Sequence, residues 1–584
     1  MNSDEIVLGL TTGGHDTSYA LLALDGTLLV HCEWERDIRI KEAVSDPFLY
    51  FLSDSSACEY YKFIKYVAYP FCPVTNSVYS HIFSNSSDLN LSWSKFEEYI
   101  SSRNLSSPLL DQDAIKSRFF LFLSGKPQHK CFGHHQSHAA EAVFSTWDQY
   151  PEEKKIILSL DGGGWDLHDN KLIETHNSAY LCKESTLQRI WIDPSFSMGN
   201  IYGIVTSSLG FSVSPPKGSQ HGSVMGLAAY GYSSVFYHLF SDDRLWCNTS
   251  IKNKQREATI SALNSLRQFI VDGIKLCDSE DMLFNFKSNI AAALQDSFNS
   301  RLVQIVKMLV RLVPDIKCIV LSGGCALNCA AAGVLVQTFS SIRFPVSLIP
   351  YDAGLAIGSA YLFSNDIRTA SSIFNLKRPT FSPYLGRRYT AFDQYNSLLS
   401  FGLKVHKLEV EDIIDSLYNK KIVAVFMGRS ESGRRALCNR SILADPRDSS
   451  IRDILNAKVK HRPAFRPFAP VVLEDQVDEW FTHNHNSPFM SHALPFKPSK
   501  KQYVQAVVHR DGTGRLQTLN AHDNPWMYQL LTKWFLKTGI PMLINTSFND
   551  NEPVVETPTN AIGCFLRTNI DMLVFPDIEV VAYR

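Results

Sequence analysis

Two histidines, His134 and His138, lie four residues apart in the segment CFGHHQSHAAEAVF. In a helix this spacing places both imidazoles on one face, where they can chelate a divalent ion. Taken alone, a His-x-x-x-His pair is more often a capping or packed pair than a metal site. The pair gains weight only beside other ligand residues.

Two aspartates supply such residues. Asp161 follows the apolar run of LSLDGGGWD, and Asp352 stands two residues before a glycine in PYDAGLAIGSA. The glycines let a ligand approach the main chain. Two histidines and two aspartates make a mixed site suited to iron, manganese or zinc acting as a Lewis acid, and these residue types do not choose among the three metals.

A further histidine, His15, follows Gly13 and Gly14 after the first apolar run. An imidazole on such a turn can take a proton from a hydroxyl, so His15 is the candidate general base. The alternative is a surface turn in which Asp16 bonds locally, as Gly-Gly-His-Asp sequences commonly do.

Cations gather in the second half of the chain, in GRSESGRRALCNR and KVKHRPAFRPFAP. Convergent Arg435, Lys460 and Arg466 would hold a triphosphate or an acyl phosphate, because guanidinium groups bind phosphate oxygens in pairs and lysine adds a point charge. A solvated charged face is the alternative, and the interleaved Phe465 and Phe468 weaken it.

Three further segments extend this anion or nucleotide site. Arg515 stands on the tight turn DGTGR, and Asn545 and Ser547 offer amide and hydroxyl groups after an apolar run. Gly323 and Gly324 form a turn where a strand becomes a helix, so a phosphate or ribose can approach the backbone there.

The elements that must position these residues alternate between strands and helices. Residues 6–10 and 19–24 predict antiparallel strands joined by tight turns. Residues 155–160, a glycine turn at 161–164 and a strand at 178–181 repeat that design. Strand, glycine turn and strand are therefore expected twice.

Apolar residues at helical spacing predict a helix at 290–309, which leads into a buried strand at 318–321. Another buried strand is predicted at 422–426. The stretch near 370–400 contains several proline turns and no strong periodicity, so we place a domain boundary there.

Bulk properties narrow the class of protein. With 584 residues, the chain exceeds what one hydrophobic core usually serves, so at least two domains are expected. Its 57 lysines and arginines balance 58 aspartates and glutamates, which disfavours nucleic acid and membranes as partners. A secretory leader and a membrane-spanning apolar run are both missing, so a cytoplasmic location is expected. The twelve cysteines lack paired zinc motifs and are interpreted as buried thiols.

Several segments together closely resemble the NodU/CmcH/TobZ family of O-carbamoyltransferases: HDTSYALL, HHQSHAAEA, LSLDGGGWD, MGLAAYG, SGGCALNC, RALCNRSILADPRD, FRPFAPVVLE and NTSFN. They span nearly the whole chain in family order. The resemblance implies an α/β protein with a duplicated ASKHA domain (the sugar kinase, Hsp70 and actin fold) at 1–370. A linker at 371–400 and a YrdC-like α/β domain at 401–584 would follow.

In such enzymes the YrdC-like domain is thought to make carbamoyl-adenylate from ATP, which enters with Mg²⁺, and a carbamate derived from carbamoyl phosphate. The N-terminal domain then transfers the carbamoyl group. The resemblance implies a small-molecule acceptor, such as a natural product or antibiotic precursor. We expect the accepting group to be a hydroxyl, with an amine in reserve, and a homodimer is left open.

Site residues are carried over by matched motif. The metal, with Fe(II) the expected ion, would be bound by His134, His138, Asp161 and Asp352, and it would polarise the carbamoyl carbonyl while His15 removes the acceptor proton. Lys460 and Arg466 would act in catalysis. The carbamoyl phosphate or nucleotide set comprises Gly13, Gly14, Gly323, Gly324, Arg435, Lys460, Arg466, Arg515, Asn545 and Ser547.

The chain departs from the family's usual pattern at three positions. Arg434 stands where proline is more typical, Cys438 where glycine is usual, and Pro463 where an acidic residue often stands. The matched cations are all present.

Three other functions share parts of this pattern. A tRNA threonylcarbamoyl transferase would share the first domain, but the near-zero net charge and the second domain argue against it. A hydrogenase-maturation protein of the carbamoyl-dehydrating kind should carry paired CxxC motifs and an acylphosphatase segment, and neither is visible. A non-catalytic nucleotide-binding regulator of the same fold would need neither the metal set nor the arginine-rich site.

Overall fold

A computed structural model describes residues 5–11, 16–84, 88–147, 154–168, 171–183, 186–249, 255–370 and 381–584. The chain divides into two compact units, each built from separated segments. The first unit comprises residues 1–199, 318–326 and 347–381, and the second comprises 200–317, 327–346 and 382–584. The two compact units are thus not continuous in sequence. The predicted division into 1–370, a linker at 371–400 and 401–584 stays a prediction.

The first unit contains two sheets. Its first sheet has the order β3-β2-β1-β4-β5, with strands β1 (Ile6–Leu10), β2 (Ser18–Ala23), β3 (Leu28–Glu33), β4 (Ile64–Pro70) and β5 (Gln128–Phe132). Strands β1 to β3 are antiparallel, and β4 and β5 run parallel to β1. The antiparallel strand pair predicted at the start of the chain is confirmed.

The second sheet has the order β11-β6-β7-β8, with strands β6 (Lys154–His168), β7 (Lys171–Lys183), β8 (Thr186–Ile192) and β11 (Ile319–Ser322). Strands β6 to β8 are antiparallel, and β11 is parallel to β6. This sheet therefore has the strand order and directions of β3-β2-β1-β4.

The glycine turn predicted at 161–164 is wrong. Strand β6 continues through these residues, and its pairing with β7 shifts register between Leu160 and Gly164. Gly163 has φ +140°, a conformation that side-chain-bearing residues rarely adopt. The glycines accommodate a bulge, which bends the strand without ending it.

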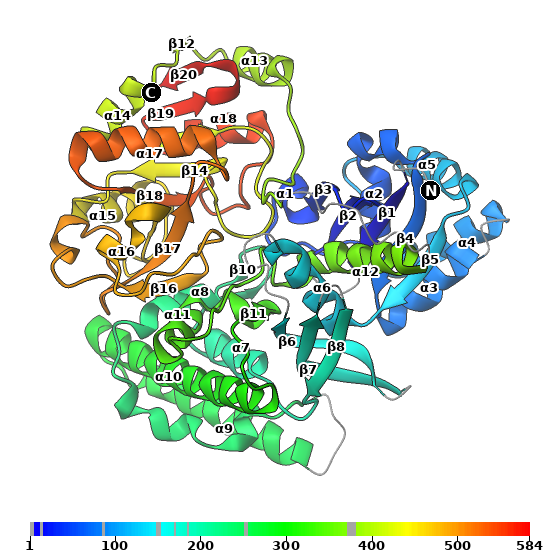
Figure 1. Ribbon diagram of the computed structural model, residues 1–584, viewed down its shortest axis with the longest axis horizontal. Coiled ribbons are helices and arrows are strands. Elements are labelled where there is room, and N and C mark those ends of the chain that lie inside the picture. The colour runs from blue at the N-terminus through cyan, green and yellow to red at the C-terminus, as the bar shows by residue number, and fades with distance from the viewer. Residues whose placement is uncertain are drawn as a thin grey trace. The chain divides into compact units, whose positions relative to one another are not determined.

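Two helices, α6 (His134–Thr146) and α12 (Leu355–Ala370), pack between the two sheets (Figure 1). Helix α12 lies close to both strand β1 and helix α6, because small residues line these contacts. A Cβ on Gly9 of β1 would lie 1.9 Å from the Ala356 carbonyl oxygen, and a Cβ on Gly358 would lie 1.9 Å from that of Ser137. Glycine thus sets the position of α6, which carries the paired histidines.

An aromatic core covers the other face of the first sheet. It includes Phe48, Phe96, Phe119 and Phe122, all buried. These side chains come from helices α2 (Pro47–Ser53), α4 (Leu89–Ser102) and α5 (Gln112–Ser124), and α1 (Trp34–Ile38) and α3 (Pro73–Ser84) complete this layer. The sheet that supports α12 is therefore covered on both faces.

The second unit contains a nine-stranded mixed sheet of order β12-β20-β19-β13-β14-β18-β15-β17-β16. Its strands are β12 (Val405–Lys407), β13 (Val423–Phe426), β14 (Arg440–Ala444), β15 (Ala469–Leu473), β16 (His492–Pro495), β17 (Thr513–Leu519), β18 (Met542–Ser547), β19 (Met572–Phe575) and β20 (Val580–Tyr583). Strand β13 confirms the strand predicted at 422–426. A two-stranded pair, β9 (Val213–Ser214) and β10 (Gly218–Ser219), also belongs to this unit.

Helices α14 (Val410–Tyr418) and α17 (Pro525–Thr538) cover part of one face of this sheet with a continuous apolar core. The other helices are α7 (Gly199–Ser208), α8 (His221–Ala228), α9 (Gln255–Lys275), α10 (Glu280–Leu312), α11 (Cys329–Thr338), α13 (Ala391–Ser400), α15 (Ser449–Lys458), α16 (Val477–Trp480) and α18 (Pro558–Arg567). Helix α10 includes the predicted helix at 290–309. Helix α13 lies inside the predicted linker. None of the helices formed by the described residues has both the length and the apolar character that a membrane crossing needs.

Candidate active site

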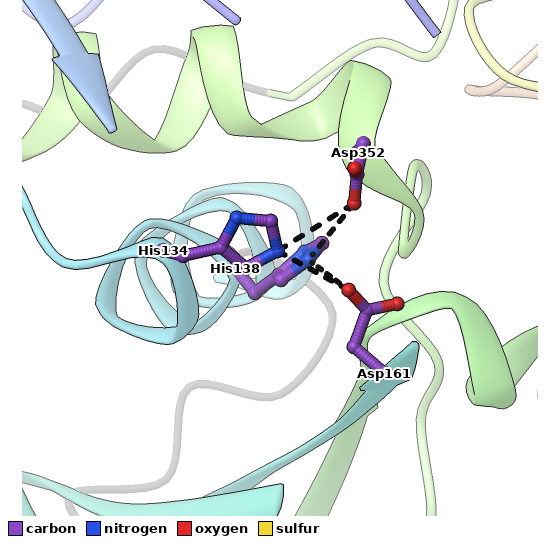
Figure 2. A group of neighbouring side chains, drawn as sticks. All are labelled: His134, His138, Asp161 and Asp352. Carbon is purple, nitrogen blue, oxygen red and sulfur yellow. Dashed lines mark hydrogen bonds and ion pairs between the residues drawn. The ribbon is translucent and has the colours of Figure 1, made fainter. Parts of the chain in front are cut away.

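Helix α6 presents His134 and His138 on one face, one turn apart (Figure 2). Their ring centroids lie 4.8 Å apart. Strand β6 passes directly beside His134, because a Cβ on Gly164 would lie 2.2 Å from that imidazole. The helical spacing predicted for the two histidines is confirmed.

Asp161 and Asp352 face these imidazoles from two other elements (Figure 2). Asp161 lies in β6, and its Oδ2 is 3.2 Å from His134 Nε2 and 3.4 Å from His138 Nε2. Asp352 begins the short turn Asp352–Gly354, and its Oδ1 is 3.6 Å and 3.5 Å from the same two nitrogens. These four atoms all lie within 4.8 Å of one another. The structure thus brings together the four residues that the sequence singled out.

The cluster is buried, and its electrostatics suit a cation. Neither ring nitrogen of His138 makes a hydrogen bond within the described part of the chain. Burial alone would lower the pKa of His138, but the facing carboxylates of Asp161 and Asp352 raise it to about 10. Burial likewise opposes ionisation of Asp161, yet the two histidines hold the pKa of Asp161 well below its usual value. Buried carboxylates need a compensating positive charge, which protons on the facing imidazoles can supply, and the same two-histidine, two-aspartate donor set also fits a divalent metal ion.

Gly323 and Gly324 lie beside this cluster. Gly323 has φ +80°, and a Cβ there would lie 2.2 Å from the Leu160 carbonyl oxygen, so only glycine fits. The N–H of Gly324 donates to Asp161 Oδ1 at 2.7 Å, which fixes the carboxylate. These two glycines therefore place the Asp161 side chain. The other predicted residues of this site, Gly13, Gly14 and His15, lie outside the described residues.

Lys460, in the second unit, follows α15 and is 2% exposed. Its ammonium donates to Asn549 Oδ1 at 2.7 Å, to the Asn549 carbonyl at 3.1 Å and to the Ser547 carbonyl. Ser547 Oγ in turn donates to Asn549 Oδ1 at 2.8 Å. Lys460 is therefore joined to the segment that carries Ser547, as a shared site requires.

The predicted arginines lie near one another in the same unit. Burial and the Arg435 guanidinium lower the pKa of Arg466 to about 10. Burial, with Arg466 nearby, also lowers the pKa of Arg515. A guanidinium stays charged at neutral pH, so the electrostatic interaction among these side chains is repulsive. Arg435 additionally donates to the Leu327 carbonyl at 3.3 Å.

Asn545 is fully buried in β18, two residues before Ser547. Its Nδ2 donates to the Gln517 side chain at 2.6 Å and to the Ala436 carbonyl at 3.1 Å. Ala436 is the residue that follows Arg435 in the chain. Arg435, Arg466, Arg515, Asn545, Ser547 and Lys460 thus all lie within the second unit.

Two residues of this region were missed by the sequence-based prediction. Burial, with Arg466 and Arg515 nearby, holds the pKa of Arg462 well below its usual value, so Arg462 belongs to the same group of cations. Its place in the run KHRPAFRP could have identified it. Gln517 lies two residues beyond Arg515 on β17, and alternation along that strand was the available signal.

Comparison with known families now bears on both sites. The family description "Carbamoyltransferase N-terminus" matches residues 6–361, and "Carbamoyltransferase C-terminus" matches residues 414–581. The first match includes the His134 cluster, and the second includes Arg435, Lys460 and Arg466.

Curated relatives agree with this family. Nodulation protein NolNO of Sinorhizobium fredii is 31% identical over 76% of this chain, and the match spans 62% of that protein, less than two thirds of its length. Nodulation protein NolO of Bradyrhizobium diazoefficiens is 29% identical over 76% of this chain and 77% of its own. A 3'-hydroxymethylcephem-O-carbamoyltransferase of Amycolatopsis lactamdurans is 32% identical over 41% of this chain and 44% of its own.

Solved structures resemble the chain only distantly. Full-length HypF in its phosphate- and nucleotide-bound form covers 62% of this chain at 15% identity and a TM-score of 0.31, with 46% of HypF matched. A component of the (R)-2-hydroxyglutaryl-CoA dehydratase of Acidaminococcus fermentans covers 62% of this chain and 98% of its own at 13% identity and a TM-score of 0.30. On the two family matches, which together take in most of its residues, the chain belongs to the carbamoyltransferase family.

Proposed function

We propose that this chain is an ATP-dependent O-carbamoyltransferase that acts on a small-molecule hydroxyl. Carbamoyl phosphate and water give carbamate and phosphate, and carbamate then attacks the α-phosphorus of ATP to give carbamoyl-adenylate and pyrophosphate. The acceptor hydroxyl attacks the carbamoyl carbon, AMP leaves and the hydroxyl proton is lost. The observation that carries the proposal is the cluster of Arg435, Arg462, Arg466 and Arg515, whose guanidinium groups lie close enough to lower one another's pKa, inside a carbamoyltransferase family match.

The arginines and Lys460 would make and hold the phosphate-bearing species. Arg435, Arg466 and Arg515 would bind the phosphates of carbamoyl phosphate and of ATP, which enters with Mg²⁺, because paired N–H donors fit phosphate oxygens. Lys460 and Ser547 would contact the reacting phosphate, with Lys460 held in place by Asn549. Arg462 joins this set from the same loop.

The His134, His138, Asp161 and Asp352 cluster would hold a divalent metal ion, with Fe(II) the expected ion. Such an ion supplies Lewis-acid polarisation of the carbamoyl carbonyl. Gly324 holds Asp161 in its orientation. His15 would take the acceptor proton, with Gly13, Gly14 and Gly323 leaving room for the ligand beside the backbone.

The fold and the acceptor are part of this proposal. Two sheets with the same strand order support a duplicated ASKHA domain, and the mixed sheet of the second unit would be YrdC-like. The cephem carbamoyltransferase supports a natural-product hydroxyl as the acceptor, with an amine in reserve. The near-zero net charge argues against a tRNA threonylcarbamoyl transferase, and a nucleotide-binding regulator would have no use for the buried candidate metal site.

The test is to incubate the purified protein with Fe(II), Mg²⁺, ATP and carbamoyl phosphate, without acceptor, and to follow phosphate and pyrophosphate release. Wild type should release pyrophosphate only when carbamoyl phosphate is present. Lys460→Ala and Arg466→Ala should each lower the rate of pyrophosphate release by about 100-fold or more, because each removes a positive charge that stabilises the reacting phosphate.

Lys458→Ala is the matched control, since Lys458 is exposed and two residues from Lys460. It should keep the wild-type rate. No release from wild type, even with hydroxyl acceptors added, would reject the carbamoyl-adenylate chemistry.

A further inference from the structure

The two aspartates of the candidate metal cluster are held in different ways. The carboxylate of Asp161 accepts the N–H of Gly324 at 2.7 Å, which fixes it independently of the histidines. Among the described residues, the carboxylate of Asp352 makes hydrogen bonds and ion pairs with His134 and His138 alone. The place of the Asp352 carboxylate therefore depends on the backbone that carries it.

This dependence matters because the ligand atoms are close together. One oxygen of Asp161 and one of Asp352 belong to a set of four ligand atoms that lie within 4.8 Å of one another. Two carboxylates at such a separation repel each other. Holding Asp352 in the cluster thus calls for a support outside it.

The residue after Asp352 is anchored to the first sheet. The carbonyl oxygen of Ala353 accepts hydrogen bonds from Ser18 Oγ at 2.8 Å and from His31 Nε2 at 2.9 Å. Because a carbonyl oxygen cannot donate, Nε2 of His31 carries the proton of this bond. Ser18 lies in β2 and His31 in the adjacent β3, and both side chains are buried, so water does not compete for the carbonyl.

The residue before Asp352 is anchored to the same sheet. The Tyr351 hydroxyl donates to Glu33 Oε2 at 2.6 Å, and Glu33 also forms an ion pair with Arg36 at 3.5 Å. These three side chains are buried as well. His31 and Glu33 are two residues apart on β3, so they share one face of the strand and hold both neighbours of Asp352.

Helix α6 holds the segment that leads to Asp352. Glu141, one turn beyond His138, accepts the N–H of Ile349 at 3.2 Å, and Ser145 Oγ accepts the N–H of Leu348 at 3.3 Å. The same helix carries both imidazoles of the cluster. The segment is therefore tied to the ligand helix before Asp352 and to the first sheet around Asp352.

We infer that Ser18 and His31 are positioning residues for the candidate metal ligand Asp352, which they hold opposite the two imidazoles through the Ala353 carbonyl. Neither side chain belongs to the set that would bind the ion. The inference rests on the metal site of the proposed function and adds a support outside the ligand set. Loss of such a support typically weakens metal binding by about 10–100-fold.

The experiment titrates the metal-free full-length protein with Co(II), whose visible absorption reports the donor atoms around it. Neither ATP nor carbamoyl phosphate is needed, so the readout is independent of activity. Wild type should bind Co(II), and Asp352→Asn, which alters a ligand, should lose most of the affinity. His31→Phe keeps a flat ring but removes the donor, so it should raise the Kd for Co(II) about tenfold or more.

Two further variants test the hydrogen bonds themselves. Ser18→Ala should raise the Kd by a smaller factor than His31→Phe, because the bond from His31 remains. His31→Gln should recover most of the affinity lost in His31→Phe, because its side-chain amide can donate to the Ala353 carbonyl.

His129→Phe is the matched control. His129 lies on β5 of the same sheet and is hydrogen-bonded to the Tyr69 hydroxyl at 3.0 Å and to Ser84 Oγ at 3.1 Å, away from the segment that carries the ligand. This variant should lower the urea midpoint of unfolding, as His31→Phe does, and leave the Kd for Co(II) unchanged.

A wild-type Kd in His31→Phe would overturn the inference and leave the metal site standing. Binding as weak in His31→Gln as in His31→Phe, or an equal loss in His129→Phe, would also overturn it, because general destabilisation would then account for the effect. Absence of Co(II) binding in wild type would remove the metal site from the proposed function, and the inference with it. Absence of pyrophosphate release would reject the carbamoyl-adenylate chemistry alone.

Discussion

At the scale of single residues, Cys438 shows how a departure from the family pattern is absorbed. Its φ is +92°, a region that favours glycine, and glycine is the usual residue at this position in the resembling family. The thiol is buried beside Gln517 and Asn545. Cys438 therefore carries a side chain at a backbone conformation that favours glycine.

This backbone should reverse the ordinary ranking of alanine and glycine. Cys438→Gly should be more stable than Cys438→Ala by about 1 kcal/mol, because alanine keeps the strain of a positive φ. Urea unfolding midpoints of the two variants measure the difference. At the exposed Ser261 in helix α9, the same pair should rank the other way, with alanine more stable. Equal midpoints at position 438 would contradict the strain argument.

A second residue-scale prediction concerns acid stability. His492 is buried between Ser487 Oγ at 3.0 Å and the Phe344 carbonyl at 2.7 Å. Burial lowers the pKa of His492 to about 4, against the bond to Phe344, whereas an unfolded histidine titrates near pH 6.5. The unfolded chain then binds more protons, so this contribution to stability is present above about pH 6.5 and is lost as pH falls toward 4.

His492→Gln should therefore flatten the dependence of unfolding free energy on pH by about 1.4 kcal/mol per pH unit between pH 4.5 and 6. Denaturant unfolding at a series of pH values provides the measurement. His238→Gln, at an exposed histidine, should leave the slope unchanged. If the slope is the same in both variants, His492 is already protonated in the folded protein.

At the scale of elements, helices and strands with a regular apolar period can be predicted from the sequence. Prediction fails at glycine-rich segments, because glycine serves both turns and strand bulges. The His134 and His138 spacing, the first strand pair and helix α10 were predictable because each element repeats its own pattern. The glycines of β6 were predicted as a turn, since a bulge and a turn both need residues without a side chain. Helix α13 escaped prediction because it follows a run of proline turns.

The packing of α12 against α6 gives a prediction at this scale. A Cβ on Gly358 would meet the Ser137 backbone at 1.9 Å, and Ser137 is the residue before His138. Gly358→Ala should thus push the two helices apart, lower the free energy of unfolding by on the order of 3 kcal/mol and weaken Fe(II) binding, although position 358 offers no ligand. Metal titration followed by thermal unfolding measures both effects.

Gly563→Ala in helix α18 is the matched control. Its Cβ would meet only the end of the Arg567 side chain, at 3.2 Å, so this substitution should stabilise the protein slightly. Gly358→Ala with wild-type metal affinity would show that α6 holds His138 independently of α12.

At the scale of the whole molecule, the second unit joins segments from both family matches. Phe465, next to Arg466, packs among Phe211, Tyr230 and Phe284 at ring distances of 6.5, 6.4 and 6.2 Å. These three partners lie in the N-terminal match, and Phe465 lies in the C-terminal one. No pattern within either segment encodes such a long-range contact. The arginines could therefore be predicted from the sequence, but the aromatic packing that holds their loop could not.

Phe465→Ala should release that loop. We expect KM for carbamoyl phosphate and for ATP to rise about tenfold, and the unfolding free energy to fall by about 2 kcal/mol, because Phe465 is half-buried. Phe465→Leu should recover part of both. Phe392→Ala, at a phenylalanine that is 73% exposed, should affect neither. Unchanged KM values in Phe465→Ala would mean that the loop holds its shape without this contact.

The order in which the segments of the first unit are synthesised has a consequence for the metal cluster. His134, His138 and Asp161 leave the ribosome early, but Asp352 follows Asp161 by 191 residues. At roughly 5–20 residues per second, that interval lasts about 10–40 s. During translation the nascent chain therefore holds three of its four candidate ligands for a substantial time, while β11 and α12, which complete the surrounding layers, are still missing. The four candidate ligands can therefore come together as in Figure 2 only after Asp352 has been made, so any ion that needs all four is held in its final coordination late in folding.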